Sequence, residues 1–190
     1  MSYDAEDTRR RIFEAATAEF AAYGLAGARI DRIATSAEAN KQAIYLYFGG
    51  KEKLFGAVVR AKLDEICHAV EIVPSSLPES VGQLFDWYQE HPELVRLLLW
   101  EALESGGERV EGEEERRETY EGHTAALVAG GVESRTAAQD LLFTVLGLVA
   151  WNFSVPQLRR LVLDEPDAAK SLARRRATVV DLARLIAERA

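Results

Sequence analysis

The stretch "NKQAIYLYFGGKEKLF", residues 40–55, concentrates hydrogen-bond donors of three chemical kinds. Amide, ammonium and phenol groups lie close together there, on Lys41, Gln42, Tyr45, Tyr47 and Lys51. Glutamine can form paired hydrogen bonds to adenine, lysine can donate to guanine O6 or N7, and phenols can donate to phosphates. These residue types at this spacing indicate a surface that binds DNA.

Three predicted helices would position these donors. The first is expected at about residues 3–22, where apolar residues repeat at helical spacing, and Gly24 suits its end. A short second helix has apolar residues at i, i+3, i+4 and i+7, which are Ile30, Ile33, Ala34 and Ala37. The third is expected at about residues 41–48, with Asn40 as its N-cap. A glycine pair ends it, and a long fourth helix begins at Lys51.

Two short helices joined by a turn and braced by a third form a helix-turn-helix. Ile44 and Phe48 are expected to face inward. The side chains that then point outward are Lys41, Gln42 and Tyr45. They lie at the N-terminal end of the helix, which enters the DNA major groove in this motif. Lys51 adds its charge to free backbone N–H groups at the start of the next helix, which predicts a phosphate contact.

The charge distribution separates a nearly neutral N-terminal part from an acidic remainder. The chain has 190 residues and a formal net charge of -8, which argues against general coating of nucleic acid. Residues 1–60 carry nine Lys/Arg against eight Asp/Glu, whereas residues 61–190 carry fourteen against twenty-three. This asymmetry indicates two parts with different partners.

The segment "RIFEAATAEFAAYG…ARIDRIATSAEANKQAIYLYFGGKEKLF" resembles the N-terminal domain of the TetR family of bacterial transcriptional repressors. The match covers residues 9–55, and its most specific part is Ile44-Tyr45-x-Tyr47-Phe48-x-x-Lys51-Glu52-x-Leu54. The resemblance implies a homodimer that binds a palindromic operator in double-stranded DNA. It also implies a variable C-terminal helical domain that forms the dimer and binds a small-molecule effector, which releases the repressor from DNA.

Carried over position by position, the resemblance assigns Asn40, Lys41, Gln42 and Tyr45 to the recognition helix, and Tyr47 and Lys51 to the DNA backbone. Two positions depart from the family pattern. Arg29 stands where the family has a capping Thr or Ser, so a cap is lost and a phosphate contact is expected in its place. Glu38 stands where the family turn has Gly. Since a left-handed non-glycine residue costs roughly 1 kcal/mol, we expect a reshaped turn and a slightly re-aimed recognition helix.

The predicted fold class is all-α, in two domains. A three-helix helix-turn-helix domain is expected at residues 1–50, and a larger helical ligand-binding and dimerisation domain at residues 51–190. Beyond the fourth helix, further helices are expected at about residues 78–90, 92–104, 108–129, 134–153 and 166–189, with a short piece near 156–163.

Aromatic and polar residues of the larger domain are candidates for the effector pocket, since such pockets combine apolar walls with a few polar groups. The candidates are Trp87, Tyr88, Trp100, Glu101, Tyr120, Phe143, Trp151 and Asn152. The carboxylate of Glu101 could face a cationic ligand beside Trp100. The alternative is that the aromatics fill the core and that Glu101 pairs with an arginine.

Dimerisation has a physical argument besides the resemblance. One recognition helix covers few base pairs, and two-fold pairing supplies a second half-site. The segment "DLLFTVLGLVAW" has small residues, Gly147 and Ala150, that permit close helix packing. With the last helix it could form a four-helix dimer interface, although both helices could instead be internal core.

Two other classes of protein are alternatives. A small helical enzyme is one, because Glu65 and His68 form a Glu-x-x-His, but a di-iron site needs two such pairs and two more carboxylates. The sequence offers no recognisable catalytic set, so we expect neither an enzyme nor a metal or cofactor. The other alternative is a ligand-binding or scaffolding bundle whose helix-turn-helix no longer binds DNA. The intact set of donors counts against it.

The sequence predicts a cytoplasmic location. Cys67 has no second cysteine to pair with, which favours a reducing compartment, and the first residues lack a signal peptide. The longest charge-free run, residues 141–158, is interrupted by Asn152, Ser154 and Pro156. A buried helix is therefore expected there and no membrane span.

Overall fold

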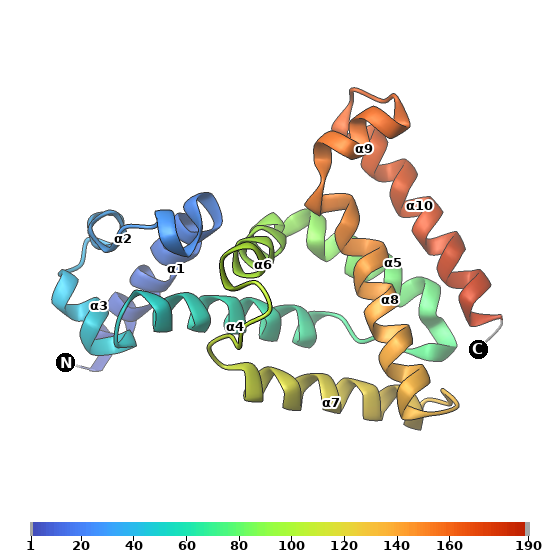
Figure 1. The fold of residues 1–190 in the computed structure, drawn as a ribbon, viewed down its shortest axis with the longest axis horizontal. Helices are drawn as coiled ribbons and strands as arrows, with labels where there is room; N and C mark the ends of the chain where they lie inside the picture. The colour runs from blue at the N-terminus through green and yellow to red at the C-terminus, as the bar shows by residue number, and fades with distance from the viewer. Residues whose placement is uncertain (1, 189–190) are drawn as a thin grey trace. The chain divides into compact units, whose positions relative to one another are not determined.

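The computed structural model describes residues 2–188, and helices account for most of that range (Figure 1). No strand occurs among the described residues, so the predicted all-α class is confirmed. The helices are α1 (Ser2–Gly27), α2 (Ile30–Ser36), α3 (Lys41–Phe48), α4 (Lys51–Ala69), α5 (Leu77–Glu90), α6 (Pro92–Ser105), α7 (Glu113–Ala129), α8 (Arg135–Ser154), α9 (Pro156–Leu163) and α10 (Ala168–Ala187), with a 3-10 helix η1 (Pro74–Ser76).

The helix boundaries follow local chemistry. Gly24 has a left-handed φ of 69° and kinks α1, where the sequence predicts a helix end. The helix predicted from about residue 108 begins only at Glu113, because Gly112 before it has a φ of 74° that an α-helix does not accommodate. Pro92 and Pro156 occupy the first positions of α6 and α9, where their missing N–H costs no hydrogen bond.

The chain divides into two compact units, each described by itself. The first comprises the residues up to Glu65 together with Glu93–Glu114, which include α1, α2, α3, most of α4, and α6. The second comprises Ile66–Pro92 and the chain from Glu115 onward, with η1, α5 and α7 to α10. The domain boundary predicted after residue 50 stays a prediction.

An apolar core holds the helix-turn-helix in the first unit. Ile12, Ala16 and Phe20 recur every four residues on α1 and are completely buried. Ile33 of α2 and Ile44 of α3 are equally buried in the same core. Five fully or almost fully desolvated side chains at helical spacing fix the short α2 and α3, which would be unstable as isolated helices.

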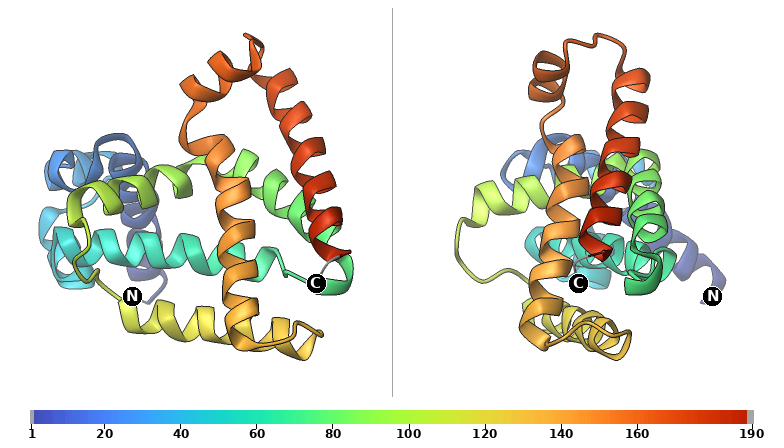
Figure 2. Two further views of the ribbon diagram at one scale, coloured as in Figure 1. Left: turned by 45° about the vertical axis from the view of Figure 1, so that its right-hand side comes forward. Right: turned by 90° about the vertical axis from the view of Figure 1, so that its right-hand side faces the viewer.

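In the second unit α10 lies along α5, and α8 contacts both helices. Figure 2 shows α9 carrying the chain from α8 over to α10. The Arg176 guanidinium of α10 binds both carboxylate oxygens of Asp86 on α5, at 2.6 and 2.7 Å. No single described helix is long and apolar enough to cross a membrane, although α8 and α9 together pass that test as a pair bent by 86°.

Candidate nucleic-acid interface

Helix α3 presents the predicted donors to solvent. The predicted N-cap is confirmed, because the Asn40 side chain accepts a hydrogen bond of 2.9 Å from the Gln42 backbone N–H. Lys41 and Gln42 are exposed, and the Tyr45 ring is 56% exposed although it is aromatic. With Ile44 at the opposite face, α3 has one buried side and one side free to enter a groove.

Sequence reasoning missed Leu46, which is 79% exposed on the same short helix. In a major groove such an apolar side chain could contact a thymine methyl group. Its signal was present in the sequence, since Leu46 falls outside the inward spacing set by Ile44 and Phe48.

The predicted backbone-binding residues border this face. Tyr47 is half-buried and packs against the core, which orients its ring. Gly49, with a φ of 78°, ends α3 and lets α4 begin at Lys51. The Lys51 ammonium donates to the Ala28 carbonyl at 3.3 Å, just before α2, and Arg29 is exposed beside it. Three groups suited to phosphate thus lie near the ends of α2 and α3.

A carboxylate of α1 binds the start of α2. Arg29 gives no side-chain cap, as the sequence predicts. The Glu19 carboxylate instead accepts the Arg29 backbone N–H at 2.8 Å and pairs with Arg32 at 2.6 Å, while the Glu19 side chain is only 9% exposed. The Arg32 guanidinium also lies 4.4 Å from the centre of the Tyr23 ring. The expected loss of a side-chain cap is therefore confirmed, and a carboxylate ten residues earlier binds the Arg29 N–H instead.

The turn between α2 and α3 holds Glu38 at a left-handed φ of 48°, where the family pattern has glycine. Arg11 of α1 binds this turn by donating to the Ala37 carbonyl at 2.9 Å and to the Glu38 carbonyl at 3.5 Å. Asp7 holds the other side of the guanidinium, 3.1 Å from Arg11 Nε. Sequence reasoning missed Arg11, whose guanidinium binds the backbone of this turn.

Helix α6 contacts the kink of α1 within the same unit. Arg96 and Trp100 both donate to the Ala21 carbonyl, at 2.7 and 3.3 Å. Glu104, one turn further along α6, accepts the Ala26 backbone N–H at 3.0 Å. A Cβ on Gly24 would lie 2.8 Å from the Trp100 indole. The kink interrupts the hydrogen bonds within α1, and residues on one face of α6 bind the carbonyl and N–H groups near it.

A charged contact connects α2 with α3. The Lys41 ammonium forms an ion pair with Asp31, and both side chains are more than half exposed. The hydrogen bond from Lys41 holds the pKa of the Asp31 carboxyl below its ordinary value, with Arg29 adding a smaller contribution. Asp31 is therefore ionised at neutral pH on a surface that otherwise carries donors.

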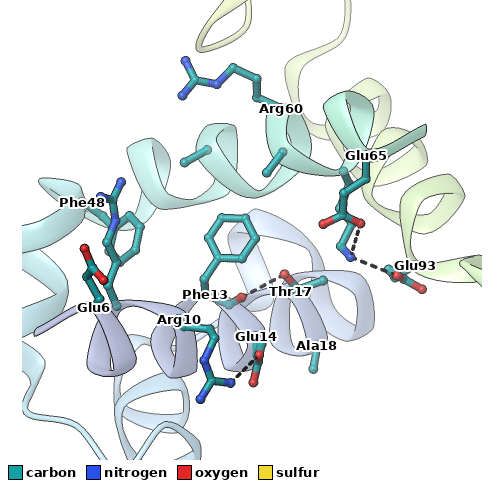
Figure 3. Close-up of a pocket in the computed structure, with 14 residues that line it drawn as sticks. Glu6, Arg10, Phe13, Glu14, Thr17, Ala18, Phe48, Arg60, Glu65 and Glu93 are labelled. Atoms are coloured by element: carbon teal, nitrogen blue, oxygen red, sulfur yellow. Dashed lines mark hydrogen bonds and ion pairs between the residues drawn. The ribbon is translucent and has the colours of Figure 1, made fainter. Parts of the chain in front are cut away.

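The first unit also contains an open groove of about 830 Å³ between α1 and α4 (Figure 3). Phe13 and Phe48 contribute apolar surface to it. On its wall, the Lys62 ammonium pairs with Glu65 at 2.7 Å and with Glu93 at 3.4 Å. The residues that line the groove include none of the predicted DNA or effector contacts.

The predicted effector residues fall in different surroundings. Trp87 and Tyr88 are buried, and the Tyr88 ring stacks on Phe153 with centroids 5.9 Å apart. Burial raises the pKa of the Tyr88 phenol. Trp100 and Glu101 belong to the first unit, whereas the other six candidates belong to the second. The structure therefore does not gather the eight residues within one compact unit.

Trp151 and Asn152 are brought together at a cavity of about 160 Å³ near the bend between α8 and α9. The buried Asn152 amide donates to the carbonyls of Leu148 and Val149, and its oxygen accepts from Arg175 at 2.8 Å. Asn152 is thus held in place on three sides. This cavity has about the size that accepts a single aromatic ring.

Large apolar side chains are exposed on α8 and α10. Phe143 is 81% exposed and Trp151, two turns later on α8, is 59% exposed. Leu182 and Leu185 of α10 are 39% and 55% exposed. Apolar groups gathered at helical spacing in this way are typical of a surface that another protein covers. Tyr120 of α7 is also exposed.

Comparisons with known proteins agree with the geometry. Residues 12–58 match the family described as "Bacterial regulatory proteins, tetR family", and residues 76–184 match "Tetracyclin repressor-like, C-terminal domain". The HTH-type transcriptional repressor SCO4008 of Streptomyces coelicolor is 43% identical over 169 residues, which are 87% of this chain and 88% of that protein. The repressor NicS of Pseudomonas putida is 37% identical over 54% of this chain and 51% of its own.

Solved structures show the same fold. The transcriptional regulator SCO4942 of Streptomyces coelicolor is 29% identical and superposes with a TM-score of 0.75 over 94% of this chain and 97% of that chain. The regulator FadR of Bacillus subtilis, solved in complex with stearoyl-CoA, is 17% identical and superposes with a TM-score of 0.62 over 92% of this chain and 97% of its own.

Proposed function

Because the chain belongs to the TetR family of bacterial regulatory proteins, we propose that it is a transcriptional repressor that binds an operator through α3 and leaves it when a small molecule binds. The observation that carries this proposal is the exposed side of α3, where Lys41, Gln42 and Tyr45 project from a helix whose other side is buried. Exposure of the Tyr45 ring does not stabilise the fold, so its place beside two long donors favours a role in binding.

We assign base contacts to Lys41 and Gln42, and contacts to the DNA backbone to Tyr47 and Lys51. Asn40 and Tyr45 complete the recognition helix, and the exposed Arg29 supplies a further phosphate contact. The half-buried position of Tyr47 supports its role, because a ring fixed by packing loses little freedom on binding. The functional boundary we propose remains after residue 50, with the effector and dimer functions at 51–190.

A palindromic operator requires two recognition helices, so we propose a homodimer formed by α8 and α10. The exposed Phe143 and Trp151 support this pairing, as does Gly147, which lies one turn from each on α8. Two copies could bury these groups in a four-helix contact, with small residues allowing the helices to approach closely.

The effector is proposed to bind in the C-terminal part of the chain. The eight aromatic and polar residues expected from the sequence remain the candidates, and Trp151 and Asn152 have the additional support of a shared cavity. The protein would act in the cytoplasm, where the operator lies, and we propose no catalytic activity for it.

Fluorescence anisotropy with DNA flanking the protein's own gene, at two salt concentrations, tests the proposal. Wild type should bind tightly, with affinity falling as salt rises. Gln42→Ala and Lys41→Ala should lose about tenfold or more in preference for the operator, whereas Tyr47→Phe should weaken binding to all sequences alike.

Binding no tighter than to random DNA, unchanged by these three substitutions, would contradict a role for α3 at that sequence. Selection from a random DNA library would then separate a distant operator from a helix-turn-helix that no longer binds. Failure of the library to yield any preferred sequence would overturn the proposal.

A further inference from the structure

We propose that Asp31 is a specificity-determining residue of the DNA-binding surface, which positions the Lys41 ammonium for a guanine and keeps it from phosphates. The inference rests on the proposed function and extends it to a residue of α2 that no resemblance singles out. The observation behind it is the ion pair between Asp31, near the start of α2, and Lys41, the first residue of α3.

Stability does not account for this pair. Both side chains are more than half exposed, at 54% for Asp31 and 57% for Lys41, and exposed pairs contribute little to folding. A carboxylate at this place also repels the phosphates that the neighbouring Arg29 and Lys51 suit. The negative charge therefore weakens DNA binding in general. Its benefit would lie in selecting particular bases.

A lysine alone discriminates poorly between base edges and phosphates. Its ammonium is a point charge on a flexible chain, and it binds phosphates as readily as base edges. Asp31 removes that freedom by holding the ammonium at the N-terminal end of α3, the end that enters the major groove. From there it can donate to guanine O6 or N7. The pair thus suits a G·C base pair.

Selection from a random DNA library, carried out with wild type and with Asp31→Asn, tests this role. Asp31→Asn should lose about tenfold in preference at one G·C position of the selected operator, the usual effect of one base pair. Its affinity for random DNA should rise several-fold, and its salt dependence should steepen by about one released ion, because Lys41 becomes free to bind a phosphate.

Three further variants separate this role from a general charge effect. Glu38→Gln removes one negative charge from the same motif without touching Lys41, so it should leave the base preference unchanged. Asp31→Glu keeps a carboxylate and should retain most of the preference. In a Lys41→Ala background, Asp31→Asn should change the preference no further, since Asp31 acts through the ammonium.

The inference is overturned if Asp31→Asn, folded as judged by an unchanged melting temperature, selects the same bases with the same discrimination as wild type. It is also overturned if the substitution changes the preference equally with and without Lys41. An absence of any selected sequence with wild type would instead count against the proposed function.

Discussion

The two units of this protein differ in the side chains that they expose and in the contacts that these side chains make. In the first, Arg11 and Glu19 of α1 bind backbone groups on either side of α2, and Trp100 of α6 binds a carbonyl of α1. In the second, apolar groups such as Phe143 and Trp151 are open to solvent on a long helix. The first unit therefore presents long polar side chains on α3, and the second exposes large aromatic side chains on α8.

This difference predicts where substitutions act. Changes at the polar contacts of the first unit should lower the stability of the chain itself. Changes at the exposed apolar residues of the second should leave folding intact and alter association. Four measurements test this distinction.

The largest effect is expected from Phe143→Glu. A charge in the centre of the α8 surface would be buried without a partner in the dimer, so dimers should dissociate and operator affinity should fall about 100-fold or more. Light scattering after gel filtration measures the mass, and anisotropy the affinity. Ala125→Glu adds the same charge at an exposed position of α7 and should do neither. A dimeric Phe143→Glu protein would exclude this surface as the interface.

Two glycines provide the next test. Gly24→Ala should destabilise the protein by about 2–4 kcal/mol, because the residue has a φ of 69° and its Cβ would collide with Trp100. Gly122→Ala should instead stabilise by roughly 0.5–1 kcal/mol, since this helical glycine of α7 has open space around it. Urea unfolding measures both. Equal effects would show that the contact between α6 and α1 is dispensable.

Removal of the buried carboxylate at Glu19 should have a smaller effect. Glu19→Gln weakens the cap on Arg29 and leaves Arg32 without its charged partner, which should cost about 1–3 kcal/mol. Glu14→Gln, the same change on an exposed surface pair of α1, should stay within about 0.5 kcal/mol. If the two variants melt alike, Glu19 is not a structural cap.

The smallest effect concerns alkaline pH and the second unit. Burial raises the pKa of Tyr88, so the folded state retains its proton when the unfolded chain has lost it. Stability should be unaffected below about pH 10, the ordinary tyrosine value, and should then fall by up to about 1.4 kcal/mol per pH unit as pH rises further. Tyr88→Phe should remove that slope in urea titrations between pH 9 and 11. An unchanged slope would mean that other groups control alkaline unfolding.

Much of the first unit could be predicted from the sequence because its signals are local. The N-cap at Asn40 and the break at Gly49 depend on residues within one helical turn. At Glu38 the expectation was a reshaped turn, and the structure keeps a left-handed φ of 48° there. The long-range contacts around α2 could not be predicted, since Arg11 of α1 binds the turn after α2 across 26 residues and Glu19 binds its start across 10, and no spacing rule links them.

The second unit shows the reverse. Its helices could be placed to within a few residues, but the burial of Trp87 and the exposure of Phe143 were not distinguishable, because both are aromatic residues within apolar helical patterns. Within the first unit, in the same way, nothing in "VRLLLWEALE" indicated that the Trp100 indole would bind a carbonyl of α1.

The helical class, the helix-turn-helix and the identity of the donors on α3 follow from the sequence alone, because helical periodicity, capping and glycine breaks are short-range effects. The tertiary structure was needed to show that Glu19 binds the start of α2, that Asp31 pairs with Lys41, and which aromatic residues are exposed. Those outcomes depend on which helix faces lie against each other, and that is set by packing between residues far apart in the chain.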